Sequence, residues 1–248
     1  MKKIIIAFLI SITSLFAGSI NIAVAANVSY AMDTLLEAFY KTNPNTEVKV
    51  TLGSSGKLTA QIKNGAPYQL FMSANMKFPQ SLYDDKIAIT KPVVYAQGSL
   101  AMLSSKEKDF SKGIMIIDSS VISKIAVANP KTAPYGKAAI EAIKNANLLE
   151  SVESKFVYAE SISQTVSYAV TAADIGFIAK SSLYSPKMTE YKEGINWVDV
   201  DSKLYTPINQ GIVILKNASD NTEAKAFYDF MLSSKAKEIM KKFGYLVP

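Results

Sequence analysis

The sequence contains no cysteine and no histidine, and every one of its 27 basic residues is a lysine. Without cysteine, disulfides and thiolate nucleophiles are excluded, and zinc sites built from cysteine and histidine are excluded as well. Without histidine, no imidazole can activate a serine nucleophile or act as a general acid or base. Without arginine, the two-pronged contact that usually holds a ligand carboxylate is missing, which disfavours an amino-acid site.

Charge is also sparse, because only 19% of the 248 residues are charged and the formal net charge is +6. The lysines are spread along the chain without a polybasic block, so nucleic-acid binding has little support. Hydrophobic residues make up 49% of the sequence, enough for the core of one large domain or two small ones. The composition therefore predicts a globular chain and does not favour nucleic acid as its partner.

The N-terminus has the form of a secretory signal: Met1-Lys2-Lys3 followed by an apolar stretch over 4–17. We expect residues 1–17 to be a signal peptide and the protein to be periplasmic. Cleavage after Ala25 fits the small-residue rule better but would remove an expected strand, so cleavage after Ala17 is preferred. An uncleaved anchor over 4–26 is the alternative. Because there is no cysteine, anchoring through a lipidated cysteine is excluded.

Short apolar runs alternate with helical patterns, which predicts an α/β fold with mostly parallel sheets. The helical pattern is clear where Met32, Leu35 and Phe39 share one face. No flexible linker separates the halves, so two lobes would be joined by short ordered crossings, for which 94–99 and 203–210 are candidates. Such a layout places a ligand between the lobes, at the carboxyl ends of the strands. The expected strands are 20–25, 48–52, 70–73, 100–103, 125–128, 156–158, 175–178 and 211–215.

Four expected loops before helices carry small or hydroxyl residues: 27–30, 53–56, 134–136 and 161–163. The first N–H groups of a helix lack internal partners and lie at the positive end of its dipole, so these loops suit an anion. Each loop alone is weak evidence, since serine and asparagine are ordinary N-caps. Tyr135 could equally be a core aromatic residue. No aspartate lies in these loops, which disfavours protonated phosphate relative to anions that only accept hydrogen bonds.

A series of short motifs, taken in their order and spacing, indicates a resemblance to a known family. They stand at 26–32 (ANVSYAM), 54–58 (SSGKL) with 61–62, 65–67 (GAP), 71–74 (FMSA), 128–130 (ANP), 133–136 (APYG), 175–177 (IGF), 205–208 (YTPI) and 243–245 (FGY). In order and spacing they resemble the periplasmic molybdate-binding proteins of ABC importers across nearly the whole mature chain.

The resemblance implies a two-lobed, type II periplasmic binding protein, with lobe 1 formed by 18–97 and 206–248 and lobe 2 by 98–205. It implies a binding protein without cofactor or enzymatic activity that closes on molybdate or tungstate and delivers it to the membrane subunits of the importer. We expect a monomer, because the sequence shows no exposed heptad pattern and no strand prone to association. By position, Asn27 and Ser55 correspond to side-chain donors of the family, and Tyr135 and Ile162 to main-chain donors. Ser29 and Ser54 are neighbouring candidates.

At two positions the sequence differs from the family pattern, and two other interpretations of the function remain as alternatives. Asn27 replaces a usual serine, and Ala179 stands where some members have a ligand-contacting tyrosine, so the sequence does not decide between molybdate and tungstate. Sulfate or another oxyanion is the nearest alternative ligand. An exported hydrolase is a further alternative, with Asp84-Asp85, Asp199 with Asp201, or Ser55 with Lys57 as its candidate groups.

Overall fold

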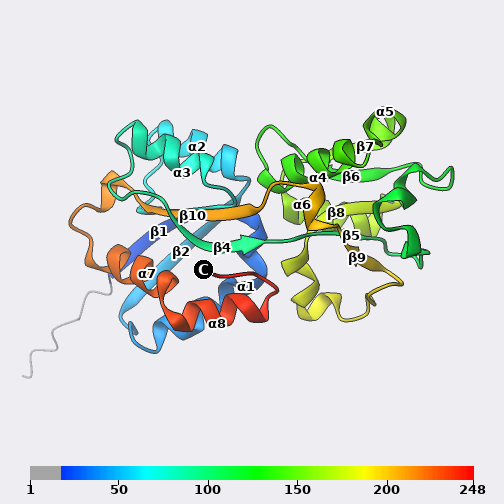
Figure 1. Ribbon diagram of the computed structural model, residues 1–248. Helices are drawn as coiled ribbons and strands as arrows, with labels where there is room; N and C mark the ends of the chain where they lie inside the picture. Colours follow the sequence, from blue (N-terminus) through cyan, green and yellow to red (C-terminus); the bar gives the residue numbers. More distant parts are fainter. Residues whose placement is uncertain (1–17) are drawn as a thin grey trace, which may run out of the picture.

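The computed structural model describes residues 18–248, which form two lobes, each built on a five-stranded sheet (Figure 1). The first sheet has the order β2-β1-β3-β10-β4 and the second the order β7-β6-β8-β5-β9. The predicted signal segment, residues 1–17, lies outside the described residues. Between residues 18 and 248, no helix combines the length and apolar character needed to cross a membrane.

In the first sheet, β1 pairs in parallel with β2 and β3, while β10 runs antiparallel between β3 and β4. The β10–β4 pairing is irregular between Gln210 and Gly211, where the register shifts. The strands span Gly18–Ala25 (β1), Thr46–Gly53 (β2), Leu70–Ser73 (β3), Val93–Gly98 (β4) and Ile208–Ile214 (β10).

The second sheet repeats this plan, with β6 parallel to β7 and β8 and with β5 antiparallel to β8 and β9. One reversed strand lies in each sheet, so the predicted α/β class and the mostly parallel sheets are confirmed. The strands span Leu100–Leu103 (β5), Ile125–Ala128 (β6), Phe156–Ala159 (β7), Ile175–Ala179 (β8) and Trp197–Asp199 (β9).

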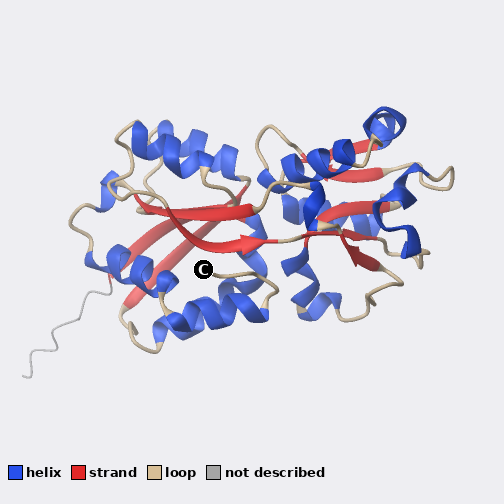
Figure 2. Cartoon of the chain, viewed as in Figure 1, coloured by secondary structure: helices blue, strands red, loops and turns tan. Residues whose placement is uncertain are grey.

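Helices cover both faces of each sheet (Figure 2). In the first lobe α1, α7 and α8 pack on one face and α2 with α3 on the other, and each group shares its own buried apolar cluster with the sheet. The bounds are Ser29–Tyr40 (α1), Ser55–Lys63 (α2), Lys77–Asp84 (α3), Thr222–Leu232 (α7) and Ser234–Lys242 (α8).

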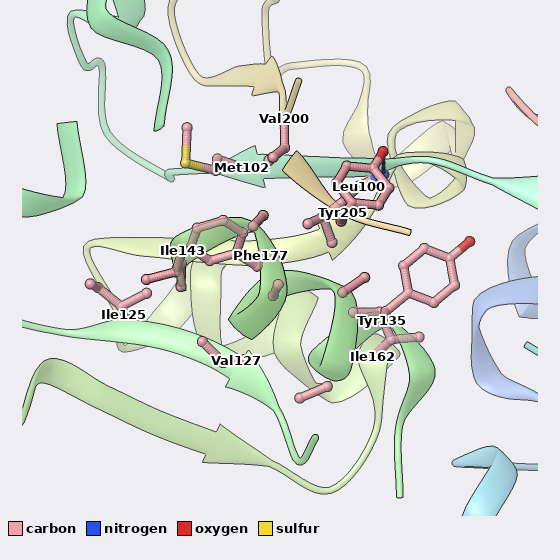
Figure 3. Packing of buried hydrophobic residues seen from close by; sticks show 14 of the residues in the cluster. Leu100, Met102, Ile125, Val127, Tyr135, Ile143, Ile162, Phe177, Val200 and Tyr205 are labelled. Carbon is pink, nitrogen blue, oxygen red and sulfur yellow. Dashed lines mark hydrogen bonds between the residues drawn. The ribbon is translucent and has the colours of Figure 1, made fainter. Parts of the chain in front are cut away.

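In the second lobe α4 belongs to one apolar cluster, while α6 adds Ile162 to that cluster and Val166 and Ala169 to a second one. The larger cluster joins α4 and α5 to β5, β6 and β8, and Leu100, Met102 and Phe177 are among its members (Figure 3). It continues into the first lobe through Ala25, Ala26 and Ala74, so the lobes are packed together. The bounds are Pro134–Asn145 (α4), Leu149–Val152 (α5) and Ile162–Thr171 (α6).

The chain passes between the sheets twice, from β4 to β5 and back from β9 to β10, and the two passages run close to each other (Figure 1). The crossing predicted over 94–99 is too long, because β4 continues to Gly98 and only Ser99 separates it from β5. The crossing predicted over 203–210 likewise includes the start of β10 at Ile208. The division into 18–97 with 206–248 and 98–205 stays a proposal.

Candidate functional site

A small cavity lies between the lobes, where α2, α4 and α6 begin. Its volume is about 10 Å³, far below the roughly 300–1,000 Å³ of pockets for drug-sized organic ligands. Three N-termini therefore meet around a space that suits an ion rather than a larger molecule. The lining residues are Ala25, Ala26, Asn27, Gly53, Ser54, Ser55, Ala74, Ala133, Pro134, Tyr135 and Ile162.

The first lobe supplies the polar side chains of the cavity. Ser54 precedes α2 in extended conformation and is buried, yet its hydroxyl caps nothing and has no hydrogen-bond partner. The Ser55 Oγ accepts a hydrogen bond from the Ala74 N–H at 3.0 Å, which leaves the hydroxyl hydrogen of Ser55 free to donate. Asn27 is fully buried, and its Oδ1 also lacks a partner. Unpartnered polar atoms are rare inside proteins, so their presence around one cavity marks a binding site.

The second lobe presents the first turns of two helices. Tyr135 is the second residue of α4 and Ile162 the first of α6, and both are buried. Figure 3 places the two side by side at the edge of the lobe's core, next to the N-terminal segment of the chain. Their N–H groups belong to helix positions that have no intrahelical acceptor, at the positive end of each dipole. These amides can therefore donate to an anion.

The cavity carries no formal charge. Tyr135 is its only titratable lining residue, and burial, assisted by the neighbouring Tyr245, raises the pKa of its phenol well above the usual range. In residues 18–248 there is no cluster of three or more aspartate or glutamate side chains that could hold a metal ion. Neutral hydroxyl and amide donors in a dry site favour a fully deprotonated anion, which only accepts hydrogen bonds.

The structure brings five of the six candidate residues from the sequence to this cavity: Asn27, Ser54, Ser55, Tyr135 and Ile162. The sixth, Ser29, is half-buried at the start of α1 and is not among the residues that line the cavity, so its role stays a prediction. Sequence reasoning missed the close-fitting wall of Ala25, Ala74 and Ala133. Small residues of this kind carry no signal except their place beside the motifs.

The candidate groups for a hydrolase do not form a site. Asp85 pairs with Lys63 through exposed side chains, and Asp199 pairs with the half-buried Lys180, both outside the cavity. Lys57 pairs with Glu160 rather than with Ser55. The Asp201 carboxylate accepts from the backbone of Lys203 as a local cap, and Asp84 accepts from Gln80 on the surface of α3.

Several contacts join the lobes around the cavity. The Gly56 N–H in the first turn of α2 donates to the Thr132 carbonyl at 2.8 Å. On the other side, Ser181 Oγ donates to the Asn27 carbonyl at 3.1 Å. An added Cβ on Gly56 would approach the Thr132 Cα to 2.9 Å, so only glycine permits this approach. The two lobes are thus held together by groups that adjoin the site.

A larger groove adjoins the cavity and shares Ala133 and Pro134 with it. Lys77, Lys131 and Lys137 line this groove, together with a single acidic residue, Glu141. The Glu141 carboxylate accepts hydrogen bonds from the backbone and hydroxyl of Thr206. The approach to the cavity on this side is therefore positively charged.

Comparison with known proteins finds relatives that bind small solutes, in agreement with a small cavity between two lobes. Residues 20–246 match the family described as bacterial extracellular solute-binding protein. The chain is 33% identical to a molybdate-binding protein of Azotobacter vinelandii over 92% of this chain and 90% of that one. It is 34% identical to one of Rhodobacter capsulatus over 93% of this chain and 89% of that one.

Solved structures give the same picture. The periplasmic molybdate-binding protein of Azotobacter vinelandii aligns with a TM-score of 0.84 at 31% identity, covering 92% of this chain and 99% of that one. The sulfate-binding protein SubI of Mycobacterium tuberculosis aligns over 92% and 86% with a TM-score of 0.73 but only 12% identity, which shows a common fold alone. The chain therefore belongs to the bacterial extracellular solute-binding protein family, together with these molybdate-binding relatives.

Proposed function

We propose that the protein captures molybdate or tungstate in the cavity between its lobes and delivers it to the membrane subunits of an ABC importer. The observation that carries the proposal is the uncharged cavity that Ser54 and Ser55 line together with the first turns of α4 and α6, and in which the Ser54 hydroxyl has no partner. Asn27, Ser55, Tyr135 and Ile162 would bind the anion, with Ser54 as an additional donor. The names of the relatives support the choice of anion.

A tetrahedral dianion fits the chemistry of the site better than phosphate does. Near neutral pH phosphate carries a proton that needs an acceptor, typically a carboxylate, and no aspartate or glutamate lines the cavity. Molybdate, tungstate and sulfate only accept hydrogen bonds, so donors alone suffice. Separation of sulfate from the two larger anions would rest on the size of the cavity, whose wall of alanine side chains leaves little room for adjustment.

The cellular role follows from the same proposal. A solute-binding protein works outside the cytoplasm, and the apolar segment at residues 4–17 is the proposed export signal to the periplasm. The ligand touches both lobes, so it would stabilise their packed arrangement and shift the population toward it. No catalysis is needed for this role, and we propose that the protein has none and acts as a monomer.

Isothermal titration of the protein lacking residues 1–17 with molybdate, tungstate, sulfate and phosphate tests the proposal. We expect one-to-one binding of molybdate and tungstate, with sulfate weaker and phosphate weakest. If sulfate alone binds tightly, the fold is right but the anion is wrong. If a folded protein binds none of the four, the oxyanion proposal fails.

A further inference from the structure

A buried polar network lies behind the cavity, centred on Gln210 of β10. Gln210 is fully buried and contacts three side chains. Its Oε1 accepts from the Asn27 Nδ2 at 2.9 Å and from the Tyr95 hydroxyl at 2.9 Å, and its Nε2 donates to the Tyr135 hydroxyl at 3.1 Å. One side chain thus connects Asn27 in the first lobe with Tyr135 in the second, and both of these residues line the cavity.

The Asn27 carboxamide is oriented so that its donors are already used. Its Nδ2 donates to Gln210 and, at 3.0 Å, to the Tyr245 hydroxyl, while its Oδ1 is buried without any partner. A carbonyl oxygen repels an anion, and an anion bound beside it would need a donor instead. In this orientation the residue does not offer the anion its NH₂ group.

Rotation of a carboxamide by 180° exchanges oxygen and nitrogen with almost no change in shape. If Asn27 turned alone, its Oδ1 would face the Gln210 Oε1, and two acceptors would be opposed. If Gln210 turns as well, its Nε2 donates to Asn27 Oδ1 and to the Tyr95 hydroxyl, and its Oε1 accepts from the Tyr135 hydroxyl. The Tyr245 hydroxyl now donates to the Asn27 carbonyl at 2.8 Å. In the turned state it would donate to Asn27 Oδ1 instead, and the Asn27 carbonyl would keep the Ser181 hydroxyl as its donor. The Asn27 Nδ2 is then free for the cavity.

We propose that Gln210 is a positioning residue for the bound anion: it turns together with Asn27, so that Asn27 presents its NH₂ group to the cavity when an oxyanion is bound. The inference rests on the proposed function, because it requires an anion in this cavity. It assigns a role in ligand binding to a residue that does not line the cavity, and it makes Tyr135 a link as well as a main-chain donor. The bound anion would then be linked to both lobes through one chain of hydrogen bonds.

Nuclear Overhauser effects from side-chain amide protons test the orientation directly. The protein is labelled with ¹⁵N at asparagine and glutamine side chains and saturated with molybdate. We expect the Gln210 Nε2 protons to lie next to the Tyr95 ring, and the Asn27 Nδ2 protons to have lost their contact with the Tyr245 ring. If the saturated protein instead keeps the Gln210–Tyr135 and Asn27–Tyr245 contacts, the proposed inversion is overturned.

Affinity provides the second readout. Gln210→Met keeps the length of the side chain but cannot orient Asn27, and we expect molybdate to bind about tenfold more weakly or worse. Gln97→Met makes the same change on the neighbouring strand β4, where the side chain makes none of the network's hydrogen bonds, and should leave the affinity unchanged. Unchanged affinity in Gln210→Met overturns the inference while the wild-type protein still binds. Absence of binding to the wild-type protein instead overturns the proposed function.

Discussion

Ser55 has two hydrogen-bond roles at the residue scale, since its Oγ accepts from the Ala74 N–H and its hydrogen remains free for a ligand. Ser55→Ala should remove one hydrogen bond to a charged ligand, worth about 1.5–3 kcal/mol, and weaken molybdate binding roughly tenfold to a hundredfold. It should also destabilise the protein by about 1–3 kcal/mol, because the Ala74 N–H loses its partner. Titration calorimetry and urea unfolding measure the two effects.

Ser29→Ala is the matched control, because Ser29 begins α1 outside the cavity. Its affinity for molybdate should equal that of the wild-type protein. A loss comparable to that of Ser55→Ala would mean that the site extends toward α1 and that the cavity is misassigned.

The buried tyrosines predict how stability depends on pH. Burial raises the pKa of Tyr95 and Tyr135 well above the usual range, whereas an unfolded tyrosine ionises near pH 10, at about its reference value. The folded state therefore holds these protons more tightly. The contribution to stability is complete below about pH 10 and is lost as pH rises above it.

Tyr95→Phe isolates this effect. Above about pH 10 each such tyrosine adds a slope of up to about 1.4 kcal/mol per pH unit to the loss of stability. The free energy of unfolding, measured by urea at pH 8 and at pH 11, should fall less steeply in the variant than in the wild-type protein. Equal slopes would show that Tyr95 ionises in the folded protein.

At the scale of elements, the first turn of α2 makes a close backbone contact with the other lobe. Gly56→Ala would press a methyl group against the Thr132 backbone, so the lobes could not pack as they do here. We expect at least tenfold weaker molybdate binding without loss of thermal stability, since alanine favours a helix by up to about 1 kcal/mol relative to glycine. Affinity is read by calorimetry and stability by thermal unfolding without ligand. Wild-type affinity in a folded variant would contradict this role of α2.

The elements also show what could be predicted from sequence. Short apolar runs bounded by turns gave three strands with their observed bounds, Leu70–Ser73, Leu100–Leu103 and Ile125–Ala128. Helix α3 was missed because Pro79 and polar residues interrupt its apolar pattern, and β9 because it has only three residues. Strand β4 was read as a crossing because its last residues approach the passage between the sheets.

The site was also only partly predictable, because local patterns can be recognised in a sequence and contacts between distant residues cannot. Its donors lie in loops that precede helices, and such loops are recognisable one at a time. The network behind them was not predictable, because Gln210 contacts Asn27 across 183 positions and Tyr245 contacts it across 218. Only the folded sheet, in which β3 lies between β1 and β10, together with the C-terminal segment brings these side chains together.

At the scale of the whole molecule, the lysines of the groove should act on the rate of capture. Lys77, Lys131 and Lys137 line the approach to an uncharged cavity, and a positive approach attracts a dianion in a salt-dependent manner. Changing all three to glutamine should lower the association rate several-fold at low salt and flatten its dependence on ionic strength, with little change in the dissociation rate. Stopped-flow fluorescence of Trp197 or competition kinetics provides the measurement.

The control replaces three lysines outside the groove, at Lys41, Lys235 and Lys241. It lowers the net charge by the same amount, so it separates local steering from the charge of the whole protein. Equal slowing of the two triple variants would contradict a role for the groove.

The most direct test of the central claim is a crystal structure of the protein with molybdate, in which anomalous scattering locates the metal atom. We expect one molybdenum peak between the lobes, with anion oxygens within hydrogen-bond distance of the Ser55 Oγ and the N–H groups of Tyr135 and Ile162. A peak elsewhere, or none in crystals of a protein that binds molybdate in solution, would contradict the assignment of this cavity.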